Sequence, residues 1–152
     1  MLDQIVPKLI ATSENGKIEL ILRVMVGFIM TYHGFGKVLN PAGLVPFLEA
    51  NAVPFPLLGA YLAAYTEFLG GLALMFGLAT RLASLGLLVC MSVAIYTLGG
   101  IAAGLHSLHG GLEYQWTLFS VFLYFTLAGA GKCSLDAVLE SKCIVNGRLA
   151  FR

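Results

Sequence analysis

The sequence predicts an all-α membrane protein, a single-domain bundle of four helices that cross the bilayer with both chain ends in the cytoplasm. Its 152 residues are 59% hydrophobic and only 11% charged, whereas a soluble domain has about a quarter charged residues. Four segments are each long and apolar enough to cross a bilayer. Nearly all basic residues fall on one side of these segments, which indicates a fixed orientation.

The first two predicted spans each contain charged residues. A helix needs about 20 mostly apolar residues to cross a hydrocarbon core of about 30 Å, since each residue adds about 1.5 Å. Residues 20–39 meet this need and carry Arg23 and Lys37 near their ends, where long side chains can reach the headgroups. Residues 57–79 follow a proline-rich loop and carry one charge, Glu67. Both segments are therefore predicted to cross the membrane.

The third and fourth predicted spans are uncharged within the membrane. Residues 82–105 have no acidic or basic side chain. Residues 114–130 begin with Tyr114 and Trp116, and such aromatic residues are typical of the membrane interface.

The distribution of basic residues predicts which side faces the cytoplasm. With four crossings, both chain ends and the turn between the second and third spans share one side, and Lys37 is the single basic residue toward the other side. The positive-inside rule then predicts a multi-pass protein of the cytoplasmic (inner) membrane with both ends inside. The eight residues on the cytoplasmic side are Lys8, Lys17, Arg23, Arg81, Lys132, Lys142, Arg148 and Arg152.

Two shorter segments are predicted to form helices at the membrane surface. Residues 2–11 have apolar side chains at helical spacing but lack the continuous apolar core of a cleavable signal peptide. Residues 135–142 follow Ser134, a favourable helix cap, and have Asp136 in the first turn, where a negative charge stabilises a helix.

Glu67 is the residue with the clearest functional prediction. It lies roughly 15 Å along its helix, near the middle of the bilayer. A carboxylate at this depth should face the interior of the bundle and either pair with a cation or take up a proton. A proton-exchanging role is one interpretation, and a purely structural role that fixes the register of neighbouring helices is the other.

Three other polar residues are predicted to lie near Glu67 in the outer half of the bundle. His33 and Lys37 are one helical turn apart in the first span, and Tyr96 reaches a similar depth in the third. Together they predict a polar pocket that opens outward, with a cationic rim suited to a carbonyl or anionic group. His33 could equally be a neutral imidazole bonded to a backbone carbonyl.

A metal site is a weaker prediction. His106, His109 and Glu113 are close in sequence and have side chains that bind zinc or copper. Their spacing is not that of a known metal motif, and a solvated loop is the other reading. The three cysteines lack CxxC spacing, and the net charge of +1 does not suggest a nucleic-acid partner. No nucleotide-binding loop or nucleophile elbow is present, which argues against an autonomous ATPase or hydrolase. Any redox chemistry would need a bound cofactor or a partner protein.

Four short motifs follow one another along residues 20–138. They consist of Arg23, Gly27, His33, Gly34 and Lys37; Glu67, Gly70 and Gly71; Gly77, Leu78, Thr80, Arg81 and Ala83; and Gly129, Gly131, Ser134, Leu135 and Asp136. Together and in this order they resemble the motifs of the DoxX family, although Ala130 and Cys133 depart from the family pattern.

The resemblance implies a four-helix membrane protein, and some members of that family are subunits of quinone-linked oxidoreductases. The resulting hypothesis is a redox or stress-linked subunit that holds a quinone-like molecule, with a protein partner or in a homo-oligomer among membrane lipids. Glu67 would exchange a proton, while His33, Lys37 and Tyr96 would bind the ligand. Two other functions stay open: a scaffold subunit without ligand, and a transporter of a small molecule or metal. The motif residues Arg23, Arg81 and Asp136 are predicted to hold the bundle together.

Overall fold

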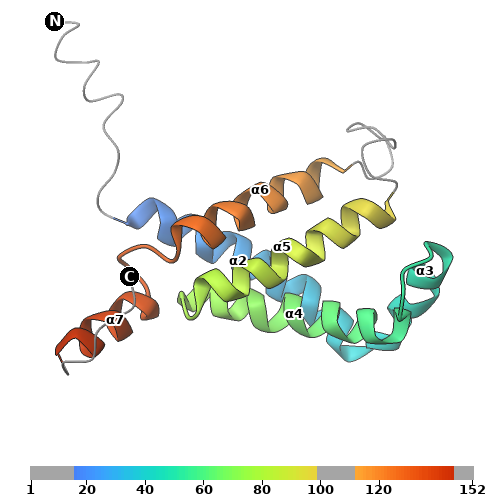
Figure 1. Ribbon diagram of the computed structural model, residues 1–152, viewed down its shortest axis with the longest axis horizontal. Coiled ribbons are helices and arrows are strands. Elements are labelled where there is room, and N and C mark those ends of the chain that lie inside the picture. The colour runs from blue at the N-terminus through green and yellow to red at the C-terminus, as the bar shows by residue number, and fades with distance from the viewer. Residues whose placement is uncertain (1–15, 99–111, 146–152) are drawn as a thin grey trace, which may run out of the picture.

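The computed structural model describes residues 16–98 and 112–145, and every element within them is helical. This confirms the predicted all-α class. The predicted helix at 2–11, the end of the third predicted span, and His106 and His109 lie outside the described residues. The elements in chain order are α2 (Lys17–Leu39), η1 (Pro41–Leu44), α3 (Val45–Ala50), α4 (Pro56–Phe76), α5 (Thr80–Thr97), α6 (Glu113–Ala128) and α7 (Leu135–Val145) (Figure 1).

Three of the described helices, α2, α4 and α5, are long and apolar enough to cross a membrane. Each of them exposes several large apolar side chains on the outside of the protein, including Phe28 on α2, Leu58 on α4 and Val89 on α5. A soluble protein rarely exposes so large an apolar surface. The exposed apolar faces therefore fit contact with lipid. Helix α6 coincides with the predicted fourth span, but its 16 residues are fewer than a perpendicular crossing needs.

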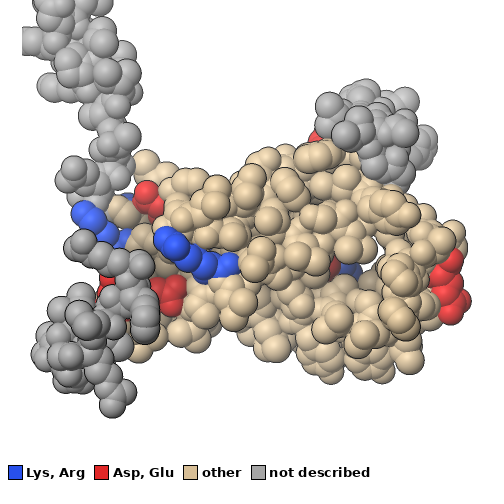
Figure 2. Space-filling view, viewed as in Figure 1, with Lys and Arg blue, Asp and Glu red and all other residues tan. Residues whose placement is uncertain are grey.

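The four long helices pack in a series, with α2 against α4, α4 against α5, and α5 against α6 (Figure 1). Their common core contains fully buried residues such as Leu74, Leu87 and Phe122. Helix α7 lies at one end of the bundle, and η1 and α3 lie at the other. The charged side chains visible in Figure 2 are found mainly toward these ends.

Glycines allow the backbones of α2 and α4 to approach closely. A methyl group placed on Gly71 would lie 2.5 Å from the backbone nitrogen of Thr31 and 2.8 Å from the carbonyl oxygen of Gly27. One placed on Gly34 would lie 2.7 Å from the carbonyl carbon of Glu67. In a membrane, such small residues let helices gain packing contacts that lipid does not offer. This approach brings the Lys37 turn of α2 against the Glu67 turn of α4.

The turn between α4 and α5 is stabilised by α7. Helix α4 ends at Gly77, which has a left-handed backbone with φ of 66°, and the Leu78 N–H donates to the Ala73 carbonyl in a helix-ending arrangement favourable for glycine. The carboxylate of Asp136 accepts hydrogen bonds from the Ala79 and Thr80 N–H groups at 2.7 and 2.9 Å. Asp136 thus caps the start of α5 from a segment far along the chain.

Arg23 connects α2 to the segment between α6 and α7. It is only 1% exposed, and its guanidinium donates to the carbonyl oxygens of Ala130 at 2.5 Å and Cys133 at 2.7 Å. Ser134, next in the chain, accepts a hydrogen bond from the Ala137 N–H and so caps α7 as its sequence predicts. A buried charge supported by hydrogen bonds of this kind joins α2 to the segment that leads into α7.

Candidate functional site

A cavity of about 590 Å³ lies at the end of the bundle that carries η1 and α3. Helices α4 and α5 form its long walls, and Phe47 and Leu48 of α3 close one side. Figure 2 shows a hollow in the surface beside α3. The lining is mainly apolar, with Lys37 and Glu67 as its charged members. A largely apolar cavity of this size with few polar groups is typical of small-molecule sites.

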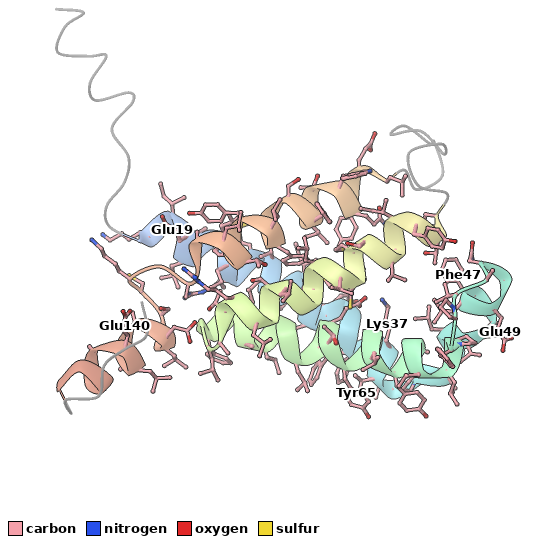
Figure 3. The ribbon with its side chains drawn as sticks, in the orientation of Figure 1. Glu19, Lys37, Phe47, Glu49, Tyr65 and Glu140 are labelled. Carbon is pink, nitrogen blue, oxygen red and sulfur yellow. The ribbon has the colours of Figure 1, made fainter. Side chains whose placement is uncertain are left out.

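Lys37 and Glu67 form an ion pair in this cavity. The Lys37 Nζ lies 2.5 Å from the Glu67 Oε1, and the two side chains are 35% and 5% exposed. Figure 3 labels Lys37 in the part of the bundle next to α3. Glu67 therefore faces the interior and pairs with a cation. This is one of the two outcomes expected for a carboxylate near the middle of the bilayer.

The Glu67 carboxylate keeps one oxygen without a partner. Its Oε2 is buried and accepts no hydrogen bond from any described residue. A buried acceptor left unpaired costs about 1–3 kcal/mol. The Lys37 ammonium has three N–H donors, one of which donates to Glu67. The pair therefore retains both accepting and donating capacity next to the cavity, which suits exchange of a proton with a bound group.

Tyr96 and a neighbouring cysteine lie on the α5 wall of the same cavity. Tyr96 is 68% exposed and lines the cavity, as does the half-buried Cys90. Val93 and Thr97 line it on the same face of α5. Cys90 lies three and seven residues before Val93 and Thr97, and this helical spacing places it on the same face of α5.

His33 is not among the residues that line the cavity. It is exposed, and its ring centre lies 5.8 Å from that of Tyr114 on α6 and 6.2 Å from that of Tyr32. The structure thus brings together three of the four residues predicted for the pocket, namely Lys37, Glu67 and Tyr96, and places the fourth beside α6. A ligand-binding role for His33 stays a prediction.

The remaining predicted site residues lie away from this cavity. Arg23 and Asp136 make the interhelical contacts described above, whereas Arg81 is exposed and makes no hydrogen bond with the described residues. Glu113 begins α6. No cluster of three metal-binding side chains occurs within residues 16–98 and 112–145. The predicted metal set depends on His106 and His109, outside those ranges, and stays untested.

The ion pair leads to a first stability prediction. Replacing Lys37 by Met leaves the buried Glu67 without its cation and should cost about 2 kcal/mol or more. In the Lys37→Met/Glu67→Leu double variant, the decrease in the free energy of unfolding should be smaller than the sum of the decreases in the two single variants, by about 1 kcal/mol or more. The midpoint of unfolding by sodium dodecyl sulfate in mixed micelles measures each value. Additive losses would show that the two side chains do not interact.

The chain is similar in sequence to one known protein family and to three individual bacterial proteins. The DoxX family profile matches residues 18–100. The chain is 30% identical to "Putative oxidoreductase CatD" of Bacillus subtilis over 117 residues, covering 77% of this chain and 83% of that protein. It is 30% identical to "Inner membrane protein YqjF" of Escherichia coli over 126 residues, covering 81% and 92%. It is also 33% identical to an uncharacterized protein of Haemophilus influenzae, covering 76% and 85%. No solved structure matches the chain significantly.

Proposed function

Because this chain belongs to the DoxX family of membrane proteins, we propose that it is a subunit or accessory protein of a quinone- or thiol-linked redox or stress system. In this proposal it binds a small redox molecule in the cavity that Lys37 and Glu67 line. The observation that carries the proposal is a partly buried ion pair on the wall of an otherwise apolar cavity. The name of the similar Bacillus subtilis protein, an oxidoreductase, supports the same class.

The chemistry of the cavity fits a quinone. Its apolar walls suit a flat ring and an isoprenoid tail, and Phe47 of α3, which lines the cavity, is itself an exposed apolar side chain. A ring carbonyl oxygen can accept a hydrogen bond from the Lys37 ammonium or the Tyr96 hydroxyl. A bound quinone would supply the uptake and release of electrons.

The protein's own residues would bind this ligand and handle protons. Glu67 holds or releases a proton at its carboxylate, and Lys37 beside it stabilises the negative form. Tyr96 orients the ligand from the opposite wall, and α3 limits access of water to the pair. We place the protein in the inner membrane with four spans and both ends in the cytoplasm, in line with the basic-residue distribution and the similar inner-membrane protein of Escherichia coli.

A binding measurement tests this proposal. Purified full-length protein in lipid nanodiscs is titrated with a short-chain benzoquinone, and bound ligand is measured by equilibrium partition and mass spectrometry. Glu67→Gln keeps the size of the side chain but removes the charge next to the ligand, and it should weaken binding about tenfold or more. Tyr96→Phe, which removes one hydroxyl donor, should weaken it about threefold to tenfold.

A matched control is available at the same end of the bundle. Glu49 on α3 is exposed and does not line the cavity, and Figure 3 shows it at the outer edge of α3. Glu49→Gln makes the same chemical change and should leave binding unchanged. Equal affinity in the wild type and Glu67→Gln would disprove the site assignment. Absence of any quinone binding in the wild type would disprove the ligand class.

A second function is favoured by one feature of the same pair. Lys37 and Glu67 join α2 to α4, so their role is purely structural if the protein is a scaffold for partner proteins. A scaffold should copurify with a partner in stoichiometric amounts and contain no extractable quinone. In that case Lys37→Met would still be less stable than the wild type. Neither the wild type nor any variant would contain bound ligand once the partner is removed.

A further inference from the structure

A second cavity, of about 760 Å³, lies at the opposite end of the bundle from the Lys37–Glu67 cavity. It is enclosed by the start of α5, the segment that follows α6, and α7. Figure 3 labels Glu140 on α7 at this end, far from Lys37. The residues that give the cavity its character are Thr80, Arg81, Leu82, Gly129, Lys132 and Glu140, and we refer to it as the α5–α7 cavity.

The α5–α7 cavity contains two cations and one carboxylate whose charges no described residue neutralises. Arg81, Lys132 and Glu140 line it, and none of them forms an ion pair or hydrogen bond within the described ranges. The other acid in the lining, Asp136, already accepts two backbone hydrogen bonds from the start of α5. Arg81 lies close over Gly129, where a methyl group would be 3.3 Å from the Arg81 Nε. Within the part of the chain that the structure describes, the cavity therefore holds unpaired charges of both signs, two positive and one negative.

A buried hydroxyl adds a neutral polar group to the same wall. Thr80 is fully buried, and its Oγ1 has no hydrogen-bond partner among the described residues. Its backbone N–H donates to Asp136, and the hydroxyl has no exposed surface, so the lining must shift slightly before this group can contact another molecule. A hydroxyl beside two cations is suited to donate a hydrogen bond to a phosphate oxygen.

The apolar surroundings of the α5–α7 cavity indicate a lipid rather than a soluble phosphate ester. Leu82 lines the cavity and is 72% exposed. Exposed Leu135, Val138 and Leu139 lie on α7, next to Glu140. A surface helix with exposed apolar side chains lies at the depth where headgroups meet acyl chains. An acyl chain attached to a headgroup in the cavity would therefore continue along apolar protein surface.

We propose that the α5–α7 cavity binds a phospholipid whose headgroup carries both a phosphate and a primary ammonium, as in phosphatidylethanolamine. Arg81 and Lys132 contact the phosphate, the Thr80 hydroxyl donates to it, and Glu140 accepts from the ammonium. A phosphatidylglycerol headgroup offers no cation to Glu140. A phosphatidylcholine headgroup has a cation without N–H donors, which excludes a hydrogen bond to that carboxylate.

The test is lipid selection by the intact protein. Full-length protein in micelles is exposed to equal amounts of phosphatidylethanolamine, phosphatidylglycerol and phosphatidylcholine with identical acyl chains, and bound lipid is counted by native mass spectrometry. We expect phosphatidylethanolamine to exceed each of the others about fivefold or more among singly bound lipids. Glu140→Gln should bring phosphatidylethanolamine down to the level of phosphatidylglycerol, and Arg81→Gln/Lys132→Gln should reduce binding of all three lipids.

Controls separate the headgroup from bulk lipid binding. Glu49→Gln, at the other end of the bundle, should retain the wild-type selection. Displacement of the bound lipid by millimolar phosphoethanolamine would show that the ligand is the headgroup alone and would overturn the lipid assignment. Equal binding of the three lipids to the wild type, or selection that survives Glu140→Gln, would overturn the proposal.

Discussion

Gly34→Ala is expected to destabilise the protein strongly, while Gly36→Ala, two residues along the same helix, is expected to leave it unchanged or make it slightly more stable. A methyl group on Gly34 would lie 2.7 Å from the Glu67 carbonyl carbon and the Phe68 Cα, which are backbone atoms of α4. Backbone atoms cannot move away by a rotamer change as a flexible side chain can, so α2 and α4 must separate. Overpacking of this kind costs about 1–3 kcal/mol.

Gly36 provides a matched control because the same methyl group would meet nothing within 4 Å. There the substitution only reduces backbone freedom in the unfolded chain, which favours the helix by about 0.5–1 kcal/mol. Unfolding by sodium dodecyl sulfate should therefore shift in opposite directions for the two variants. Equal shifts of the same sign would show that α2 and α4 are not in backbone contact at Gly34.

The Gly34 variant should also weaken ligand binding in the Lys37–Glu67 cavity. Lys37 lies one turn from Gly34, and Glu67 contributes the backbone that Gly34 touches. Separating the helices lengthens the path that the Lys37 side chain must span to reach the carboxylate. A loss of quinone binding in Gly34→Ala with normal binding in Gly36→Ala would connect the helix contact to the proposed site.

The helices could be predicted from the sequence because the length of each apolar segment and the positions of proline and glycine determine where a helix begins and ends. The predicted spans at 20–39 and 57–79 correspond to α2 and α4. Prolines at the beginning of α4 and glycine at its end have fixed roles in helix geometry. The short elements η1 and α3 were missed because Pro41 and Pro46 were interpreted as loop residues. Each in fact occupies the first turn of a short helix, a position that proline tolerates.

The candidate site could be predicted only in part, since depth along a helix does not determine direction around it. Depth and charge were enough to suggest that Lys37 and Glu67 meet. Gly34 is the residue of α2 that touches α4 at this level, and His33 is turned from it by about 100°. Lys37 reaches Glu67 because its side chain is long, whereas the shorter side chain of His33 remains beside Tyr114.

The contacts that Asp136 and Arg23 make with distant segments could not be predicted without coordinates. The sequence motifs around Gly77, Thr80 and Asp136 were recognised in order, but nothing in their spacing indicates that they touch. In the structure, the Asp136 carboxylate caps α5, and its own N–H donates to the Gly77 carbonyl at 2.9 Å. The same applies to Arg23, whose two acceptors are more than 100 residues away in the chain.

Arg23→Ala is expected to be the most damaging single substitution at the end of the bundle that carries α7. It removes two hydrogen bonds from a charged donor and leaves the buried carbonyl of Ala130 without its partner. Each charged hydrogen bond contributes about 1.5–3 kcal/mol, so a loss of about 3 kcal/mol or more is expected. Such a loss is a large share of the about 5–15 kcal/mol that holds a typical protein folded.

Two further variants separate the geometry of Arg23 from its charge. Arg23→Lys retains the charge but not the planar fork that reaches the Ala130 and Cys133 carbonyls together, so it should recover only part of the lost stability. Lys17→Ala removes an exposed cation from the start of the same helix and should change stability by about 0.5 kcal/mol or less. If Arg23→Lys were as stable as the wild type, charge alone would explain the role of Arg23. If Arg23→Ala were no worse than Lys17→Ala, the contact between α2 and the segment before α7 would contribute nothing to the fold.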